Sequence, residues 1–244
     1  MRRRKMLDIF VYGKTLPEAY HKALTALYGS ENGEISLTMK VFEPFAEPRI
    51  SRCWFGGPRD LEQYRQEIVN GILDFEAEKG LWHYTYHQRF SKWIPGVIEE
   101  LKRDPNSRRA AISVRDNFED EGNENPACLQ HIQFMIRDGK LDMYVLFRSN
   151  DGPRASFMNA FGLTELQKYV ADELGVQVGS YTHRANNYHV YPESRDQLSQ
   201  YVFRILGKKE VTYNYTGDWD KLMESEREAI ANTVADQKRK AGVE

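Results

Sequence analysis

Two strand-like segments around the dipeptide Asp138-Gly139 constrain the fold of this chain more than any other feature. Apolar and polar side chains alternate on both sides of the dipeptide, with the apolar positions at Ile132, Phe134 and Ile136 and then at Leu141, Met143, Val145 and Phe147. A period of two is typical of a strand with one buried face. Asp-Gly favours the tight turn of a two-residue hairpin, where both central residues adopt positive φ angles. The sequence therefore predicts an antiparallel hairpin.

The predicted hairpin determines which residues meet at its open end. Cys128 lies ten residues before Asp138, and Arg148 lies nine residues after Gly139. Antiparallel pairing therefore places the two side by side at one edge of the sheet. A cationic side chain next to a cysteine favours the thiolate, which is the nucleophilic form. Taken alone, Cys128 would be interpreted as an ordinary buried apolar residue; beside Arg148 it predicts a site for covalent chemistry.

Five other segments have the apolar period of an amphipathic helix. The first begins at a capping box, Thr15 to Glu18, and ends at Gly29. The second carries an apolar stripe from Leu61 to Phe75 and has Glu67 at its border, where a carboxylate can reach a cavity. The remaining three segments run from Ile94 to Arg103, from Leu163 to Leu174 and from about Trp219 to Ala241.

Strands are predicted at Ile35 to Val41, Ala110 to Val114 and Val176 to Ser180, and a polar stretch from Asn186 to Tyr191 follows the last of these. Because helices and strands do not alternate regularly, the fold class is predicted to be α+β, with a mixed, mostly antiparallel twisted sheet flanked by helices. The chain has 244 residues and lacks a Pro/Gly/Ser-rich linker or repeat. We therefore expect a single domain over residues 1–244.

Composition narrows the classes of partner. The chain has 34 basic and 36 acidic residues, so its net charge gives no reason to expect binding to a nucleic-acid polymer or an anionic membrane. No apolar run is long enough to span a bilayer and no signal-like stretch follows the basic start, which predicts a cytoplasmic protein. The two cysteines, Cys53 and Cys128, form no disulfide framework, and no spacing of Cys and His resembles a zinc site. We expect no metal.

Four ordered blocks resemble the thymidylate synthase superfamily, which includes thymidylate synthases and pyrimidine-nucleotide hydroxymethylases. The blocks are Ser107-Arg108-Arg109, Pro126-Ala127-Cys128 with Gln133-Phe134, Arg148-Ser149-Asn150-Asp151 with Asn159 eight residues later, and His189-Val190-Tyr191. Upstream, Glu67-Ile68 resembles the family's glutamate segment and Tyr84-Thr85-Tyr86 its tyrosine segment. The resemblance implies a thymidylate-synthase-like fold that forms a homodimer through its sheet.

The resemblance also implies a reaction. Cys128 would add to carbon 6 of a pyrimidine nucleoside 5'-monophosphate, so that carbon 5 attacks the one-carbon unit of 5,10-methylenetetrahydrofolate. Glu67 and Tyr86 would order water and move protons. Asp151, with Trp82 nearby, would contact the folate. The alternative for Asp151 is a turn-forming aspartate before Gly152-Pro153.

For the nucleotide, the resemblance assigns the phosphate to Arg148 and Ser149 of one subunit and to Arg108 and Arg109 of its partner. Without the resemblance, Arg108 and Arg109 would be a solvated turn. His189 and Tyr191 would bond the sugar hydroxyl, and the alternative for both is packing at a strand end. The family's N-terminal phosphate-binding arginine has no clear match, with Arg49 and Arg52 as the candidates.

Asn159 would read the base, since its amide offers one donor and one acceptor to O4 and N3–H of uracil. A flipped amide could face cytosine instead, so dUMP is favoured while a cytidylate remains open.

Three departures distinguish this chain from the synthases. The chain ends in Lys238-Arg239-Lys240-Ala241-Gly242-Val243-Glu244 rather than in an apolar lid, Leu129 replaces the usual histidine after the cysteine, and Trp82 is the one tryptophan near the site. Excluding water from a site prevents hydrolysis of reactive intermediates, so a less sealed site favours a hydroxymethyl product over a methyl product. We therefore expect a hydroxymethylase, with a thymidylate synthase as the alternative and a non-catalytic nucleotide-binding dimer as an interpretation of another class.

Overall fold

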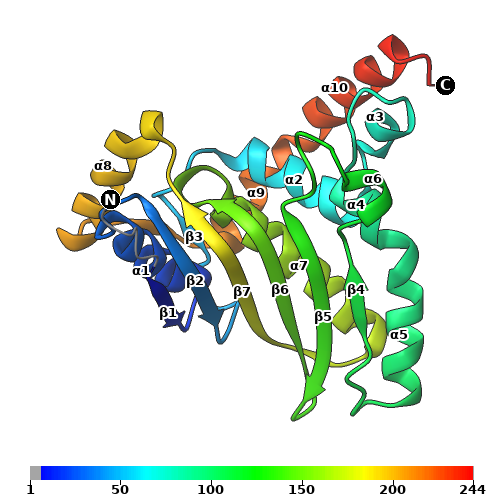
Figure 1. Ribbon diagram of the computed structural model, residues 1–244, viewed down its shortest axis with the longest axis horizontal. Helices are drawn as coiled ribbons and strands as arrows, with labels where there is room; N and C mark the ends of the chain where they lie inside the picture. Colours follow the sequence, from blue (N-terminus) through cyan, green and yellow to red (C-terminus); the bar gives the residue numbers. More distant parts are fainter. Residues whose placement is uncertain (1–6, 244) are drawn as a thin grey trace.

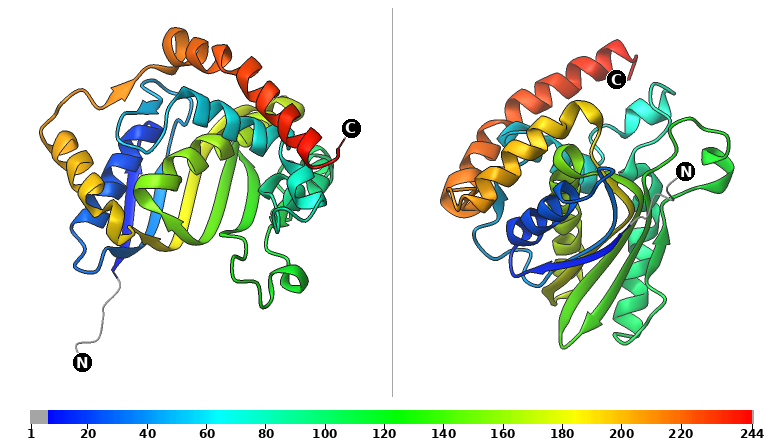
Figure 2. Two further views of the ribbon diagram at one scale, coloured as in Figure 1. Left: turned by 90° about the horizontal axis from the view of Figure 1, so that it is seen from above. Right: turned by 60° about the vertical axis from the view of Figure 1, so that its left-hand side comes forward.

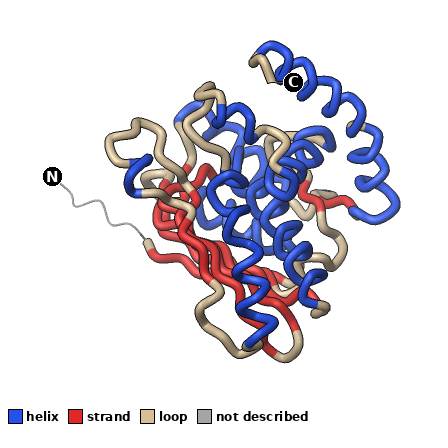
Figure 3. Tube along the Cα trace, turned by 90° about the vertical axis from the view of Figure 1, so that its right-hand side faces the viewer, coloured by secondary structure: helices blue, strands red, loops and turns tan. Residues whose placement is uncertain are grey.

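The computed structural model describes residues 7–243 and has two layers (Figure 1). One layer is a six-stranded sheet in the order β1-β2-β7-β6-β5-β4. Helices cover one face of this sheet and leave the other face without a helical layer, as Figure 3 shows. The pairs β1–β2 and β6–β7 are parallel and the other neighbours are antiparallel. The predicted α+β class with a mixed sheet flanked by helices is confirmed.

The strands of the large sheet are β1 (Asp8–Gly13), β2 (Glu34–Val41), β4 (Ala111–Ser113), β5 (Leu129–Arg137), β6 (Lys140–Asp151) and β7 (Gln177–His189). A second, two-stranded sheet pairs β3 (Ile50–Ser51) with β8 (Thr212–Tyr213). The longer helices are α1 (Leu16–Tyr28), α2 (Pro58–Asn70), α5 (Ile94–Arg103), α7 (Phe157–Leu174), α8 (Arg195–Leu206) and α10 (Arg227–Lys240). The short helices are α3 (Asp74–Glu78), α4 (Tyr86–Phe90), α6 (Asn117–Asp120) and α9 (Asp220–Ser225).

The hairpin of β5 and β6 forms as predicted. Asp138 and Gly139 adopt φ angles of 51° and 73°, and these positive values give the turn a twist that matches the flanking strands. Ile132 pairs with Val145 and Leu129 pairs with Phe147. An irregularity between Leu129 and His131 shifts the register close to Cys128, and such bulges re-aim side chains next to active sites.

The apolar core lies between the sheet and its helical layer. Helix α7 packs against α2 and lies behind the sheet in Figure 1, and it buries Phe157, Phe161 and Val170. Figure 2 shows the helical layer from two further sides. Helix α1 begins where the sequence predicts, because the side chain of Thr15 accepts a hydrogen bond from the backbone N–H of Glu18 at 3.4 Å. The predicted segment from Ile94 to Arg103 is also helical over its full length.

The other face of the sheet is partly exposed. Along β6 the buried residues alternate with the half-buried Asp142, Tyr144 and Leu146, and on edge strand β1 the side chains of Phe10 and Tyr12 are 62% and 56% exposed. Tyr12 also meets Phe42, with ring centroids 6.0 Å apart. This sheet face therefore combines polar groups with exposed aromatic rings.

Several predicted boundaries were wrong. The helix predicted from Leu61 to Phe75 ends at Asn70, because Gly71 adopts a left-handed conformation with φ of 62° and terminates α2. The strand predicted from Val176 to Ser180 begins at Gln177 and continues to His189, so most of the polar stretch is strand. Strand β1 and helix α8 were not predicted. Among residues 7–243, no helix is long and apolar enough to cross a bilayer.

Gly71 combines a left-handed backbone conformation with close neighbours, so a side chain there is expected to be destabilising. A Cβ at Gly71 would lie 2.2 Å from Nδ1 of His87, whereas a Cβ at Gly80, with φ of 69°, would meet nothing within 4 Å. Both alanine variants incur the left-handed penalty of about 1–2 kcal/mol, but only Gly71→Ala adds a steric clash worth about 1–3 kcal/mol.

We therefore predict that the free energy of unfolding in urea decreases by about 1–3 kcal/mol more for Gly71→Ala than for Gly80→Ala. Equal losses would show that the packing around Gly71 can relax.

Candidate active site

Cys128 and Arg148 meet at the open end of the hairpin. The backbone N–H of Arg148 donates to the carbonyl oxygen of Cys128 at 2.9 Å. The guanidinium of Arg148 donates from Nε to the carbonyl of Ala127 at 3.1 Å and from Nη2 to the carbonyl of Pro126 at 2.8 Å. Arg148 therefore fastens the segment that carries the half-buried Cys128 thiol, and its guanidinium is held at the two residues that precede the cysteine.

Polar residues from two parallel strands join this edge of the sheet. In the ladder of β6 and β7, Asp151 is paired with His189, and Oγ of Ser149 lies 3.2 Å from Nδ1 of His189. The ring of Tyr191 contacts that of His189 edge-on at 4.8 Å. Ser149, Asp151, His189 and Tyr191 thus form one cluster beside Arg148.

Asp151 lies on this cluster and caps the turn that leads into α7. Its Oδ1 accepts a hydrogen bond from the backbone N–H of Arg154 at 3.1 Å. Burial raises the pKa of Asp151 above its ordinary value, although the bond from Arg154 opposes the shift. The turn-forming role that the sequence offered as an alternative is therefore real, and it leaves one carboxylate oxygen for other partners.

A wall of aromatic and acidic side chains faces the cysteine from the helical layer. It encloses a cavity of about 210 Å³ lined by Tyr64, Glu67, Trp82, Tyr84, Tyr86 and neighbouring residues. The hydroxyl of Tyr86 accepts a hydrogen bond from the backbone N–H of Leu129 at 3.3 Å, which joins this wall to the strand after Cys128. The side chain of Trp82 is 45% exposed, so it forms the outer edge of the cavity.

Glu67 is the acidic group of this wall. Its Oε1 accepts a hydrogen bond from Nε2 of Gln63 at 2.9 Å. Burial raises the pKa of Glu67, and the bond from Gln63 only partly opposes the shift. A carboxyl group with a raised pKa is suited to exchanging protons near neutral pH. Burial likewise raises the pKa of Tyr84 and of Tyr86, which keeps both hydroxyls protonated.

Asn159 on α7 reaches the same region. Its Nδ2 donates to the hydroxyl of Tyr64 at 2.5 Å, and its Oδ1 accepts from Nδ2 of Asn150 at 2.9 Å. Sequence reasoning missed both partners as site residues. Tyr64 was assigned to an apolar stripe, although its position one turn before Glu67 places both on one helix face. Asn150 lies within the motif from Arg148 to Asp151, and nothing in the sequence shows that it points at Asn159.

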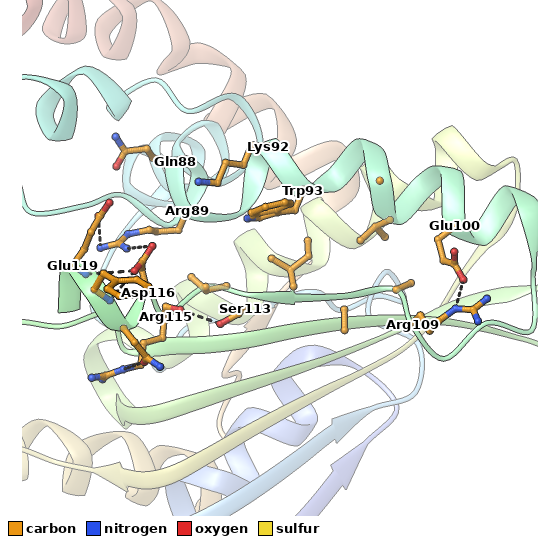
Figure 4. A pocket seen from close by; sticks show the side chains of 18 residues that line it. Gln88, Arg89, Lys92, Trp93, Glu100, Arg109, Ser113, Arg115, Asp116 and Glu119 are labelled. Carbon is orange, nitrogen blue, oxygen red and sulfur yellow. Dashed lines mark hydrogen bonds and ion pairs between the residues drawn. The ribbon is translucent and has the colours of Figure 1, made fainter. Parts of the chain in front are cut away.

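Arg108 and Arg109 do not reach Cys128 within one chain. They precede β4, and the carbonyl of Arg108 accepts from Gln133 at 3.0 Å, several residues along β5 from Cys128. Nε of Arg109 donates to Glu100 at 2.8 Å. Figure 4 shows this pair at one end of a groove of about 740 Å³ between α5 and β4, whose lining does not include Cys128.

At the other end of this groove, Arg89 pairs with Glu119 at 3.1 Å and with Asp116 at 3.8 Å, as Figure 4 shows. Arg89 also pairs with Asp120 at 3.2 Å. This buried arginine holds α6 against α4 and so anchors the loop that leads to Cys128.

Both candidates for the N-terminal phosphate arginine are paired with a carboxylate of the same chain. Arg49 is fully buried, with Nη2 at 2.7 Å from Glu165 and its guanidinium over the ring of Phe45 at 4.0 Å. Arg52 lies over the ring of Tyr213 at 3.7 Å and pairs with Glu210. Both arginines stabilise the core and the small sheet.

Known proteins match this chain over the segment that carries the candidate site. The family model described as thymidylate synthase matches residues 62–228, which is more than half of the chain. This chain belongs to the thymidylate synthase family. The match begins just before Glu67 and extends past Tyr191, so it includes the cysteine, the tyrosine wall and the polar cluster.

Individual relatives come from archaea and a phage. A protein of Methanosarcina barkeri named "Putative thymidylate synthase" is 31% identical over 211 residues, which cover 83% of this chain and 94% of the relative. One of the same name from Methanocaldococcus jannaschii is 38% identical over 160 residues, covering 62% of this chain and 72% of the relative. The deoxyuridylate hydroxymethyltransferase of Pseudomonas phage M6 is 32% identical over 165 residues, covering 64% of this chain and 47% of the phage protein.

The raised pKa of Glu67 predicts that this residue lowers stability at neutral pH. Above its raised pKa the carboxylate is ionised in both states, and the folded state carries the desolvation cost. Below the ordinary value of 4.5 the carboxyl is protonated in both states and this cost disappears.

The free energy of unfolding of Glu67→Gln at pH 7 should therefore be at least equal to that of the native protein, since the glutamine can still accept a hydrogen bond from Gln63. The advantage should shrink as pH falls through the window between the raised and the ordinary pKa. Urea unfolding at several pH values measures it, and a Glu67→Gln protein that is less stable only at pH 7 would contradict the assignment of the shift to burial.

Proposed function

We propose that this protein is an enzyme that transfers a one-carbon unit from 5,10-methylenetetrahydrofolate to carbon 5 of a pyrimidine nucleoside 5'-monophosphate, with dUMP as the favoured substrate and a hydroxymethyl group as the product. The observation that carries the proposal is the position of Cys128 beside Arg148, with Ser149, His189 and Asn159 around the same end of the sheet. A thiol, a cation and groups able to read a base are the components that covalent activation of a pyrimidine requires.

The chain's own residues supply covalent and acid–base catalysis. The sulfur of Cys128 forms a bond to carbon 6, which makes carbon 5 nucleophilic, and the same bond breaks when the product leaves. Arg148 stabilises the thiolate and binds the phosphate with Ser149. Glu67 and Tyr86 exchange protons at O4 and carbon 5, a role that the raised pKa of Glu67 supports. His189 and Tyr191 bind the sugar hydroxyl.

The residues near the cavity fit a folate. Methylenetetrahydrofolate supplies a one-carbon unit at the oxidation level of formaldehyde. The half-exposed ring of Trp82 offers a flat apolar surface at the cavity, and Asp151 has a carboxylate oxygen free to accept from the N–H groups of a pterin. Trp82 and Asp151 would therefore hold it.

Two features support a hydroxymethyl product. The cavity beside Glu67 is large enough to hold water molecules, and Glu67, Tyr64 and Tyr86 place polar groups in its lining, so Glu67 can direct a water molecule at the transferred carbon. The phage relative named deoxyuridylate hydroxymethyltransferase provides a precedent for this outcome. The balanced reaction is dUMP plus methylenetetrahydrofolate plus water, giving hydroxymethyl-dUMP and tetrahydrofolate. A thymidylate synthase, the alternative, would reduce the carbon to methyl and release dihydrofolate.

A homodimer through the open sheet face completes the proposed site. The exposed aromatic rings on β1 and the half-buried residues on β6 support an interface there. Arg108 and Arg109 are far along β5 from Cys128 of their own chain, which supports the family's arrangement in which they bind the phosphate held by the partner. The opposing interpretation, a nucleotide-binding dimer without turnover, has to explain the intact thiol, cation and buried carboxyl.

Product analysis tests the proposal. We expect the protein, incubated with dUMP and methylenetetrahydrofolate, to form hydroxymethyl-dUMP and tetrahydrofolate, as measured by mass spectrometry. Thymidylate and dihydrofolate as main products would favour a synthase, and nucleotide binding without turnover would favour the binding module.

In the same assay, Cys128→Ser should lose at least about 10³-fold in turnover, since the hydroxyl is a weak nucleophile at its free pKa. The buried Cys53→Ala is the matched control and should retain turnover. Release of the carbon 5 hydrogen by Cys128→Ser at the native rate would remove the nucleophile assignment.

A further inference from the structure

We propose that three buried residues behind Asn159, namely Asn150, His183 and Tyr181, fix the orientation of the Asn159 amide and thereby make the site select uracil over cytosine. The inference rests on the proposed function in one respect, which is that Asn159 contacts the base. It goes further because it resolves which way that amide faces and names the residues responsible.

The four side chains and Tyr64 form one continuous hydrogen-bonded chain. The hydroxyl of Tyr181 lies 3.0 Å from Nδ1 of His183, and Nε2 of His183 lies 3.1 Å from Oδ1 of Asn150. Nδ2 of Asn150 then donates to Oδ1 of Asn159 at 2.9 Å, and Nδ2 of Asn159 donates to the hydroxyl of Tyr64 at 2.5 Å. The chain runs from the core beneath the sheet to the wall of the cavity.

His183 is rigid and neutral within this chain. It is fully buried, and its ring stacks on that of Phe147 with centroids 4.6 Å apart and planes 12° apart. Burial lowers the pKa of His183 to about 3, so the imidazole carries one proton at neutral pH. One ring nitrogen therefore donates and the other accepts.

The position of Tyr181 decides which nitrogen of His183 donates. Tyr181 is fully buried, and within residues 7–243 its hydroxyl has no hydrogen-bond partner other than His183. If Tyr181 donates to Nδ1, then Nε2–H donates to Asn150, and each buried group from Tyr181 to Asn150 has a partner. If every hydrogen bond in this series ran in the opposite direction, the hydroxyl hydrogen of Tyr181 would be buried without an acceptor, which is unfavourable.

At the opposite end of this hydrogen-bonded chain, the hydroxyl of Tyr64 accepts from Asn159 when the bonds run in the favoured direction. Its own hydrogen is then available for another acceptor. Tyr64 lines the same cavity as Glu67, so water or that carboxylate can accept its hydrogen. The two ends of the chain therefore differ, since one is a closed core and the other opens on the cavity. This difference makes the hydrogen bonds run in one direction, from Tyr181 to Tyr64.

This direction leaves Asn159 with the complement of uracil. One N–H of its amide is occupied by Tyr64 and one lone pair of its oxygen by Asn150. The remaining N–H can donate to O4, and the remaining lone pair can accept from N3–H. Cytosine presents an acceptor at N3 and a donor at position 4, and it would require the amide to flip. A flip would turn the amide nitrogen of Asn159 toward the amide nitrogen of Asn150, two donors with no acceptor between them.

Asn150→Asp is the direct test. A carboxylate at position 150 can accept from His183 and from Asn159 at the same time, so it should draw the Asn159 nitrogen inward and flip the amide. We expect the dissociation constant of dCMP divided by that of dUMP to fall by about tenfold or more, where tenfold corresponds to about 1.4 kcal/mol. Calorimetry on the full-length protein measures both constants.

Two further variants keep the result interpretable. Tyr188→Phe removes another buried tyrosine hydroxyl from β7. That hydroxyl bonds Ser156 at 2.7 Å and is not part of the hydrogen-bonded chain, so this variant should leave the ratio unchanged. His183→Phe retains the stacking on Phe147 but removes the donor to Asn150, so the ratio should also fall. This second variant serves if Asn150→Asp does not fold, as judged by thermal denaturation.

A ratio that stays native in a folded Asn150→Asp or His183→Phe protein would overturn the inference. So would an equal change in Tyr188→Phe, since that would indicate general loosening. Turnover of dUMP, measured in parallel, separates this result from the proposed function. If the binding ratio shifts in the variants but the native protein does not turn over dUMP, only the proposed reaction is contradicted. If the native protein turns over dUMP but the ratio does not shift in the variants, only the inference is contradicted.

Discussion

The site depends on the backbone pairing of β5 with β6 at the open end of their hairpin. The bond from the N–H of Arg148 to the carbonyl of Cys128 continues the ladder beyond the last regular pair, and the guanidinium then binds the two carbonyls before the cysteine. The arginine therefore fixes the backbone that carries the thiol and keeps its guanidinium at the segment before the cysteine. The parallel partner β7 adds His189 to the same end. The sheet alone therefore assembles the thiol, the cation and the polar cluster.

The helical layer contributes a different kind of chemistry, which comes from desolvation. Burial raises the pKa of Glu67 and keeps the hydroxyls of Tyr84 and Tyr86 protonated, so the wall facing Cys128 consists of groups that can hold or exchange a proton. Full burial of Tyr181 also gives the polar chain behind Asn159 its direction, since the hydroxyl needs an acceptor within the protein. The sheet thus positions the charged and polar groups, and the helical layer provides the buried groups that hold or exchange protons beside the cavity.

The sequence predicted the parts of this arrangement that arise from local pattern. The hairpin, the capped start of α1 and the span of α5 follow from periodicity and turn chemistry, and counting residues from the turn was enough to bring Cys128 and Arg148 together. Prediction failed where tertiary packing overrode the pattern. The apolar stripe continues past Gly71, but the left-handed glycine ends α2 so that His87 and Asp74 can pack against it. The polar stretch after Ser180 is strand because β2 and β6 pair with it on both sides. Tyr64 and Asn150 could not be recognised, since their role is defined by a contact between α2, α7 and β6.

The central claim is that the sulfur of Cys128 becomes covalently attached to the pyrimidine, and trapping with 5-fluoro-dUMP tests it most directly. Fluorine at carbon 5 cannot leave as a cation, so an adduct formed in the presence of methylenetetrahydrofolate cannot proceed. The account predicts that peptide mapping by mass spectrometry finds the nucleotide and the folate attached together to the peptide containing Cys128, with the peptide containing Cys53 unmodified. Recovery of the Cys128 peptide in its free form after prolonged incubation, or attachment at Cys53, would contradict it.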